Sequence, residues 1–173
     1  MTRKTTQRLV MSAVMAALCC VATMIFRIPI YSTNGYIHFG DGFVILSGFL
    51  LGPVYGMAAA GIGSMLADIL SGYAHYAIPT LLIKALAALV AALIFRALQK
   101  RNAKLTLSTV LAGIGAALVV VLGYFAIEAT ILGYGIGAAA SMPMNAIQGG
   151  AGMIISSILL PLLLRVPYFK EML

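Results

Sequence analysis

The stretch GFVILSGFLLGPVYGMAAAGIGSMLADILS, residues 42–71, decides the fold of this chain. Its 30 residues include one charged side chain, and Gly52-Pro53 lies near its middle. A straight helix of that length would measure about 45 Å, too long for one membrane span, whereas two full spans need about 40 residues. Because proline ends a helix and glycine permits a turn, we expect two short helices that meet at this dipeptide.

The composition of the 173-residue chain predicts a lipid environment rather than water. Hydrophobic residues make up 62% of the chain, charged residues make up 9%, and the mean hydropathy is +1.07. A water-soluble domain carries about 25% charged residues. We therefore expect an all-α, multi-pass protein of a prokaryotic plasma membrane, with the lipid bilayer as its surroundings. A soluble globular protein is excluded.

The positive charges indicate which segments face the cytoplasm. Nine of the eleven Lys and Arg residues lie in three short segments, at residues 3–8, 96–104 and 165–170. Cytoplasmic connections of membrane proteins carry such an excess of cations. If the first two segments are both cytoplasmic, an even number of crossings separates them, so residues 42–71 must cross twice.

The expected architecture is a six-transmembrane-helix bundle with both termini in the cytoplasm. A single transmembrane domain, residues 1–173, would contain helices at about 9–26, 42–52, 54–71, 78–98, 105–128 and 141–164. The net charge of +7 follows from the cytoplasmic connections. No basic patch with interleaved aromatic residues occurs, so nucleic acid is not an expected partner.

Five polar residues at membrane depth are the first candidates for function, namely Asp68, Lys84, Glu128, Asn145 and Gln148. An ionisable group there costs on the order of 2.5–3.5 kcal/mol or more, which makes it a functional candidate by default. All five fall in the outer half of their predicted helices, so a polar cavity would open outward. Lys84 could contact a ligand, form an ion pair with Asp68 or Glu128, or snorkel to the interface.

The other four candidates also have structural alternatives. Asp68 and Glu128 lie close enough to the interface for ordinary solvation. Asn145 and Gln148 share one helical face, which suits either a heterocyclic ligand or a contact between helices. The tyrosines on the outer side fit an aromatic belt, although one or two could stack on a ligand ring.

The histidines and cysteines predict no site. His38 and His75 fall in outer loops and are expected to be surface residues. Cys19 and Cys20 are adjacent within the first apolar run, where we expect small core residues rather than a disulfide.

Motifs for catalysis are missing from the chain. It contains no H-E-x-x-H, no P-loop and no G-x-S-x-G sequence. We therefore expect no enzymatic activity, no cofactor and no metal. A binding protein within the membrane fits the residues better than an enzyme.

Four segments of the chain resemble a known family. They are FGDG at residues 39–42, LLGPVYG at 50–56, AAGIGSMLAD at 59–68 and IKAL at 83–86. Together they resemble the substrate-binding S components of energy-coupling factor (ECF) transporters, in particular the riboflavin-transporter-type branch. The resemblance covers most of the chain and is strongest between Gly40 and Lys84.

The resemblance implies a function and a set of partners. Such S components capture a vitamin or vitamin precursor from outside and assemble with a transmembrane T component and two cytoplasmic ATPases. The A-x-x-x-A pair of the first helix, Ala13 and Ala17, would dock on the T component, and the loop at residues 27–41 would act as a gate.

The resemblance also implies where the ligand binds. Lys84, Asn145 and Gln148 match the positions that bind ligand in the family, and Glu128 and Asp68 complete the polar set. The chain has no tryptophan for stacking on a ligand, which leaves Tyr36, Phe39 or Tyr124. The small number of polar groups favours a hydroxymethylpyrimidine-like or pyridoxine-like compound over riboflavin.

A second class of function stays open at this point. An independent secondary transporter or channel for a small polar solute would need a polar path through the inner half of the bundle. The sequence offers almost none, because Leu, Ala, Val, Ile and Gly dominate there.

Overall fold

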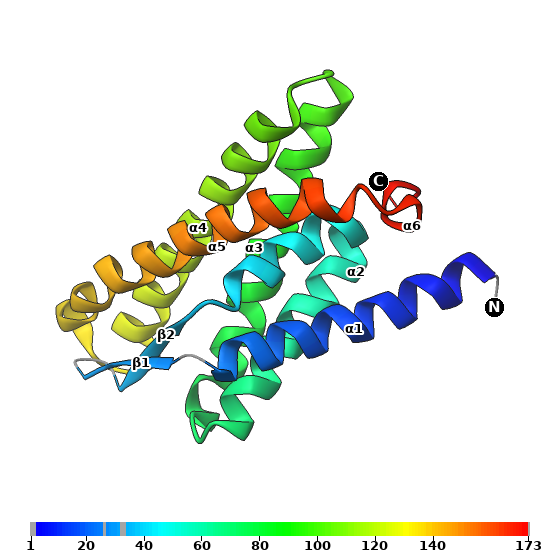
Figure 1. The fold of residues 1–173 in the computed structure, drawn as a ribbon. Helices are drawn as coiled ribbons and strands as arrows, with labels where there is room; N and C mark the ends of the chain where they lie inside the picture. The colour runs from blue at the N-terminus through cyan, green and yellow to red at the C-terminus, as the bar shows by residue number, and fades with distance from the viewer. Residues whose placement is uncertain (1–2, 26, 32–33, 173) are drawn as a thin grey trace.

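Five long helices form the protein, as a computed structural model shows for residues 3–25, 27–31 and 34–172 (Figure 1). They are α1 (Arg3–Ile25), α2 (Asp41–Leu70), α3 (Ala77–Lys100), α4 (Leu105–Thr130) and α5 (Met142–Leu163), and a short α6 (Pro167–Lys170) follows. Each of the five is long and apolar enough to cross a membrane. The prediction of an all-α, multi-pass membrane protein is confirmed at this level.

Helix α2 consists of two helical halves. Gly52 has φ 77° and ψ −170°, a backbone conformation that interrupts the helix and that only glycine adopts readily. The halves fold back on each other, since a Cβ placed on Gly56 would lie 2.8 Å from the Ser47 carbonyl oxygen. Figure 1 shows the first half running away from β2 and the second half returning. The predicted break at Gly52-Pro53 is confirmed.

Residues 27–41, expected to be a loop, contain a β-hairpin. Strands β1 (Arg27–Ile30) and β2 (Gly35–His38) pair antiparallel, with Arg27 opposite His38 and Ile30 opposite Gly35. The predicted loop also includes residues 32 and 33, and the first helix was predicted to end at Phe26; these three residues lie outside the described residues. The other helix ends agree within two residues, except that α1 already begins at Arg3.

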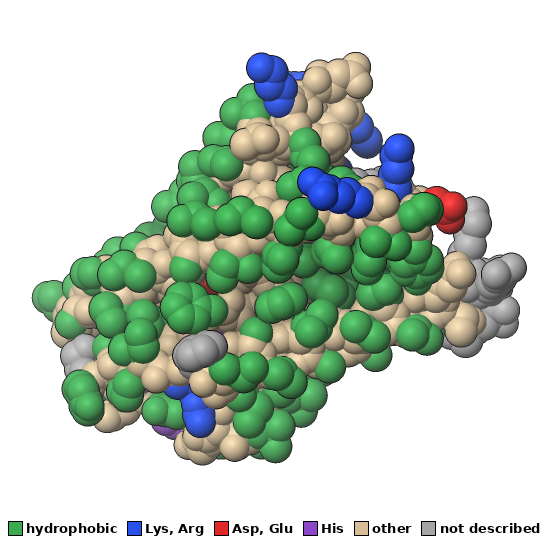
Figure 2. Space-filling model, in the orientation of Figure 1, with side chains coloured by type: hydrophobic (Ala, Val, Ile, Leu, Met, Phe, Trp, Pro, Cys, Tyr) green, Lys and Arg blue, Asp and Glu red, His purple; other side chains and the backbone are tan. Residues whose placement is uncertain are grey.

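The two ends of the bundle differ in their connections (Figure 1). The β-hairpin, the 3₁₀-helix η1 (Ala74–Tyr76) and the 3₁₀-helix η2 (Gly135–Ser141) lie at one end, here called the hairpin end. The N-terminus, the α3–α4 turn and the C-terminal segment lie at the other, here called the basic end. In Figure 2, Lys and Arg side chains gather toward the basic end, and the flank between the ends is largely hydrophobic.

Close backbone contact holds the helices together near the basic end. Helix α2 packs on α1, α3 and α5. A Cβ on Gly48 would overlap the Ala88 carbonyl oxygen of α3, so glycine is required for this approach. Phe49 and Phe95 stack next to it, with 4.6 Å between ring centroids. Small residues at helix contacts are the usual means of packing in lipid.

Candidate functional site

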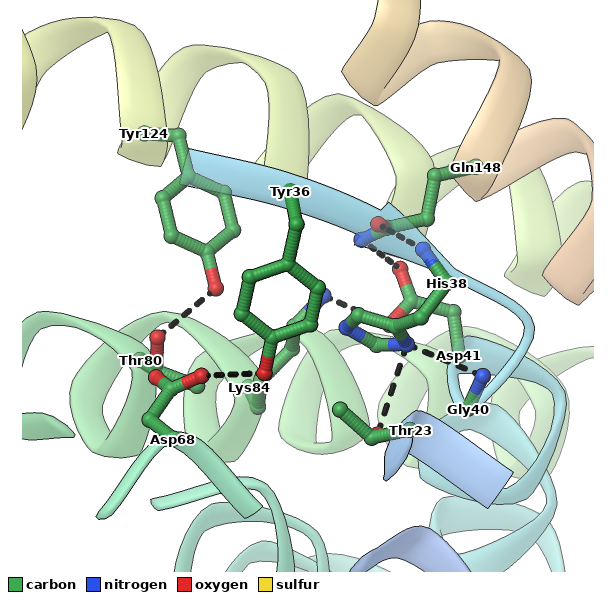
Figure 3. A network of polar contacts seen from close by, with 10 residues as sticks. All are labelled: Thr23, Tyr36, His38, Gly40, Asp41, Asp68, Thr80, Lys84, Tyr124 and Gln148. Atoms are coloured by element: carbon green, nitrogen blue, oxygen red, sulfur yellow. Dashed lines mark hydrogen bonds and ion pairs between the residues drawn. The ribbon is translucent and has the colours of Figure 1, made fainter. Parts of the chain in front are cut away.

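A buried ion pair lies at the hairpin end of the bundle (Figure 3). Lys84 Nζ of α3 lies 2.5 Å from Asp41 Oδ1, at the first residue of α2, and the two side chains are 0% and 2% exposed. It is the only ion pair within 4 Å in the described part of the chain. The sequence analysis named Asp68 and Glu128 as potential partners of this lysine, and that was wrong. Asp41 follows the hairpin as the first residue of α2, and the path of the hairpin places it next to α3.

Gln148 connects this ion pair to the hairpin. Its Nε2 donates to Asp41 Oδ2 at 3.0 Å, and its Oε1 accepts from the backbone N–H of His38 at 3.0 Å. One amide side chain of α5 therefore joins the ion pair to strand β2. The hairpin is fastened to the bundle through a hydrogen bond that spans 110 residues of sequence.

His38 is buried rather than a surface residue, which corrects the prediction. Its side chain is 7% exposed, and its Nδ1 accepts from the backbone N–H of Gly40 at 2.9 Å. The Thr23 hydroxyl of α1 lies 3.3 Å from the same nitrogen. Burial, and then the nearby charge of Lys84, lower the pKa of His38 from 6.5 to about 3. The imidazole is therefore neutral in this arrangement. His75, by contrast, is exposed as predicted.

Two further carboxylates lie in a second cluster beside the ion pair. Tyr36 donates to Asp68 Oδ1 at 2.6 Å, and both burial and the charge of Asp68 raise the pKa of the Tyr36 hydroxyl. Glu128 accepts from Tyr76 at 2.9 Å and from Ser141 at 2.5 Å. Both carboxylates are thus held by neutral hydroxyl groups.

A small cavity lies between these two carboxylates. The space open to the centre of a water molecule is about 20 Å³, room for roughly one water. The cavity is lined by Ile30, Tyr36, His38, Asp68, Tyr76, Thr80, Tyr124, Glu128 and Asn145. Strand β2 covers it, together with residues from α2, α3, α4 and α5.

The structure distributes the predicted polar residues between two neighbouring groups. Lys84 and Gln148 meet through Asp41, whereas Asn145 lies in the cavity wall and donates to Ser141 at 3.4 Å. Lys84 is outside the cavity lining, but its Nζ lies 5.3 Å from the centroid of the Tyr124 ring.

The three aromatic candidates lie in two different pockets. Tyr36 and Tyr124 line the polar cavity. The Tyr124 hydroxyl shares a hydrogen bond of 2.9 Å with Thr80. Phe39 is 45% exposed and instead lines a separate apolar pocket with Ile28 and Ile37.

Several residues of this site escaped the sequence analysis, namely His38, Asp41, Tyr76, Thr80 and Ser141. One signal could have found Asp41. The chain has only four acidic residues, and this one directly precedes an apolar run, where a carboxylate stabilises a helix N-terminus. Short hydroxyl side chains in apolar helices carry no comparable signal.

The arrangement offers hydrogen-bonding groups rather than a reaction centre. In the part of the chain that the structure describes, no group of three His, Cys, Asp or Glu residues could hold a metal ion. Donors and acceptors from four helices and the hairpin instead converge on one enclosed space. Convergent polar groups in an enclosed space, several of them on aromatic rings, are a feature of small-molecule sites.

A second surface feature lies on α1, away from this cluster. Ala13 and Ala17 are exposed, and they line an apolar groove between α1 and the second half of α2. Val54, Tyr55 and Ala58 form part of its opposite wall.

Comparison with known proteins gives the family. The family described as "ECF-type riboflavin transporter, S component" matches residues 3–165. A Pyrococcus woesei protein described as "Uncharacterized protein in gap 3'region" is 38% identical over 135 residues, which cover 78% of this chain and 86% of that protein. A solved structure described as "Structure and mechanism of the S component of a bacterial ECF transporter" has the same fold. Its TM-score is 0.68 at 21% identity, covering 93% of this chain and 97% of that one. The chain therefore belongs to the ECF-type riboflavin transporter S component family, whose members are membrane transport proteins and not enzymes.

Proposed function

We propose that this protein captures a small vitamin-like molecule from outside the cell for uptake by an ECF transporter. The ligand would bind at the hairpin end, between strand β2 and the outer parts of α2 to α5. The observation that carries the proposal is the enclosed polar cluster around Asp68 and Glu128, because ionisable groups at this depth cost free energy and are therefore usually kept for a function. A hydroxymethylpyrimidine, a pyridoxine-like compound and riboflavin are the ligands to test first.

The hairpin is proposed to be the gate of this site. The cavity holds about one water molecule, so a vitamin can enter only if the covering strand moves. The contacts of strand β2 with the bundle must then break and reform, namely those of His38 with Gln148 and Thr23 and that of Tyr36 with Asp68.

The proposed topology has six membrane crossings with both termini and the α3–α4 turn in the cytoplasm. The break at Gly52 and the cations at the basic end support it. Cysteines introduced at Ile136 and at Gln99, in a chain with Cys19 and Cys20 replaced by alanine, test it in intact cells. An impermeant maleimide should label position 136 and not position 99, and labelling at 99 would contradict the topology.

The apolar groove on α1 is proposed as the docking surface for the T component, with ATP hydrolysis on two further subunits. Ala13→Leu or Ala17→Leu should then abolish uptake in cells that carry the whole transporter, while ligand binding to the purified protein stays near that of the parent. A larger side chain on α1 would keep it apart from a helix of the T component, at a distance where van der Waals attraction is weak. Normal uptake by these variants, or lost binding with normal assembly, would contradict the assignment.

An independent secondary transporter is the alternative function, and one experiment separates the two. Proteoliposomes that contain only this chain should accumulate no vitamin under an ion gradient. Uptake should appear only with the T component and the ATPases present.

A further inference from the structure

Among the described residues, the hairpin end of the bundle buries more carboxyl groups than Lys or Arg side chains, and two of these carboxyl groups line the cavity. Asp41, Asp68 and Glu128 are three of the four acidic residues in the chain, and all three are at most 3% exposed. Lys84 is the only buried cation among the described residues, and it is paired with Asp41. Asp68 and Glu128 are left with no positive partner.

Asp68 in particular has an unused acceptor that faces this cavity. Its Oδ1 accepts from Tyr36, whereas its buried Oδ2 accepts no hydrogen bond of good geometry and has only the Thr80 hydroxyl beside it. The Thr80 hydroxyl next to it shares a hydrogen bond with Tyr124 (Figure 3). A buried acceptor without a partner costs free energy, which a ligand N–H donor would recover.

The remaining walls of the cavity also suit a positive charge. Tyr36, Tyr76 and Tyr124 line it, and the Tyr76 and Tyr124 ring centroids are 6.2 Å apart. Aromatic faces next to carboxylates form the usual environment of bound organic ammonium groups. A bare metal ion fits less well, because no three His, Cys, Asp or Glu side chains among the described residues come together to hold one.

From these observations we infer that the ligand is a small heterocycle with a positively charged nitrogen, whose N–H groups bind Asp68 and Glu128. The inference rests on the proposed function and narrows it to a substrate class. A neutral or anionic vitamin would leave both buried carboxylates without a positively charged partner, which is unfavourable.

Two matched pairs of probes test this inference by isothermal titration of the purified full chain at pH 7.5. The first pair is 4-amino-5-aminomethyl-2-methylpyrimidine and its 5-hydroxymethyl counterpart, and the second is pyridoxamine and pyridoxine. Within each pair the aminomethyl compound carries an extra positive charge at nearly equal size. In at least one pair it should bind about tenfold tighter or better, the effect of one charged hydrogen bond.

Glu128→Gln and Asp68→Asn are the matching variants, because each removes a charge at constant shape. Each should lower the affinity for the aminomethyl compound by about tenfold or more and leave the hydroxymethyl compound within about twofold. Glu171→Gln, at the exposed C-terminal segment, is the control and should change neither.

The other outcomes overturn the inference. Equal affinity, a preference for the neutral member, or no binding of any of the four probes each contradicts a cationic ligand. Riboflavin, titrated in parallel, separates the two proposals. If riboflavin binds and the aminomethyl compounds do not, the capture function stands and the inference falls. If no vitamin binds, both fall.

Discussion

The two ends of the bundle hold their helices together in different ways. Near the basic end, α2 and α3 meet through glycine and alanine backbones, and Phe49 stacks on Phe95. At the hairpin end, an ion pair and a chain of hydrogen bonds connect α2, α3 and α5. Close apolar packing is sufficient to associate helices in lipid. Asp68 and Glu128 lie outside the ion pair that connects these helices, and this is the reason to assign those two carboxyl groups to a ligand.

The largest expected effect comes from breaking the ion pair. Lys84→Met leaves Asp41 as an uncompensated buried charge and should destabilise the protein by about 3–5 kcal/mol. The double variant Lys84→Met with Asp41→Asn removes both charges and should regain most of that loss. Thermal unfolding of detergent-purified protein measures both, and Lys100→Met on the exposed turn is the matched control. A double variant no more stable than Lys84→Met would show that the pair is not the source of the loss.

The next prediction tests the close backbone packing near the basic end. Gly48→Ala places a methyl group against the Ala88 backbone and should cost about 1–3 kcal/mol by overpacking. A Cβ on Gly150 meets nothing within 4 Å, so Gly150→Ala should be neutral or stabilise α5 by up to about 1 kcal/mol. Thermal unfolding compares the two variants. Equal stability of both would argue against close backbone packing as the basis of this end.

The smallest effect is a pH dependence of the hairpin. Burial holds the pKa of His38 near 3, whereas a lifted hairpin would restore a value near 6.5. A neutral buried histidine favours the closed hairpin fully above pH 6.5, and this preference is lost progressively as the pH falls below 6.5. Between pH 7.5 and 5.5 the open-to-closed ratio should rise by about tenfold.

An introduced tryptophan can report this change by its fluorescence, because the chain itself contains no tryptophan. Phe39→Trp places it next to strand β2, where its fluorescence should shift as the hairpin lifts. In a second variant His38→Asn retains an acceptor for the Gly40 N–H and has no group that titrates in this range, so its signal should not depend on pH. The same pH dependence in the His38→Asn background would exclude histidine as its cause.

The sequence predicted the helices well for a physical reason. Apolar runs of membrane length and the distribution of cations are strong, additive signals, and Gly52-Pro53 marks the turn in α2. The β-hairpin carried no such signal, because its strands are four residues each and contain Pro29. A two-stranded hairpin is not stable alone and depends here on its contacts with the bundle.

Which residues belong to the site was easier to predict than which of them contact each other. Lys84, Asp68 and Glu128 are conspicuous because charges are rare at membrane depth. The partner of Lys84 could not be predicted, because Asp41 lies 43 residues away and only the path of the hairpin brings it to α3. His38 was misassigned for the same reason, since its loop position suggested exposure until the strand was found to cover the cavity.

Native mass spectrometry tests the central claim, ligand capture at the hairpin end, most directly. The full chain is purified in mild detergent from cells grown in rich medium, beside Glu128→Gln and the control Glu171→Gln. The account predicts a small-molecule adduct on the parent and on Glu171→Gln that is lost or strongly reduced on Glu128→Gln. An adduct retained equally by Glu128→Gln would contradict binding through that carboxylate, and no adduct on the parent, even after incubation with a vitamin mixture, would contradict capture itself.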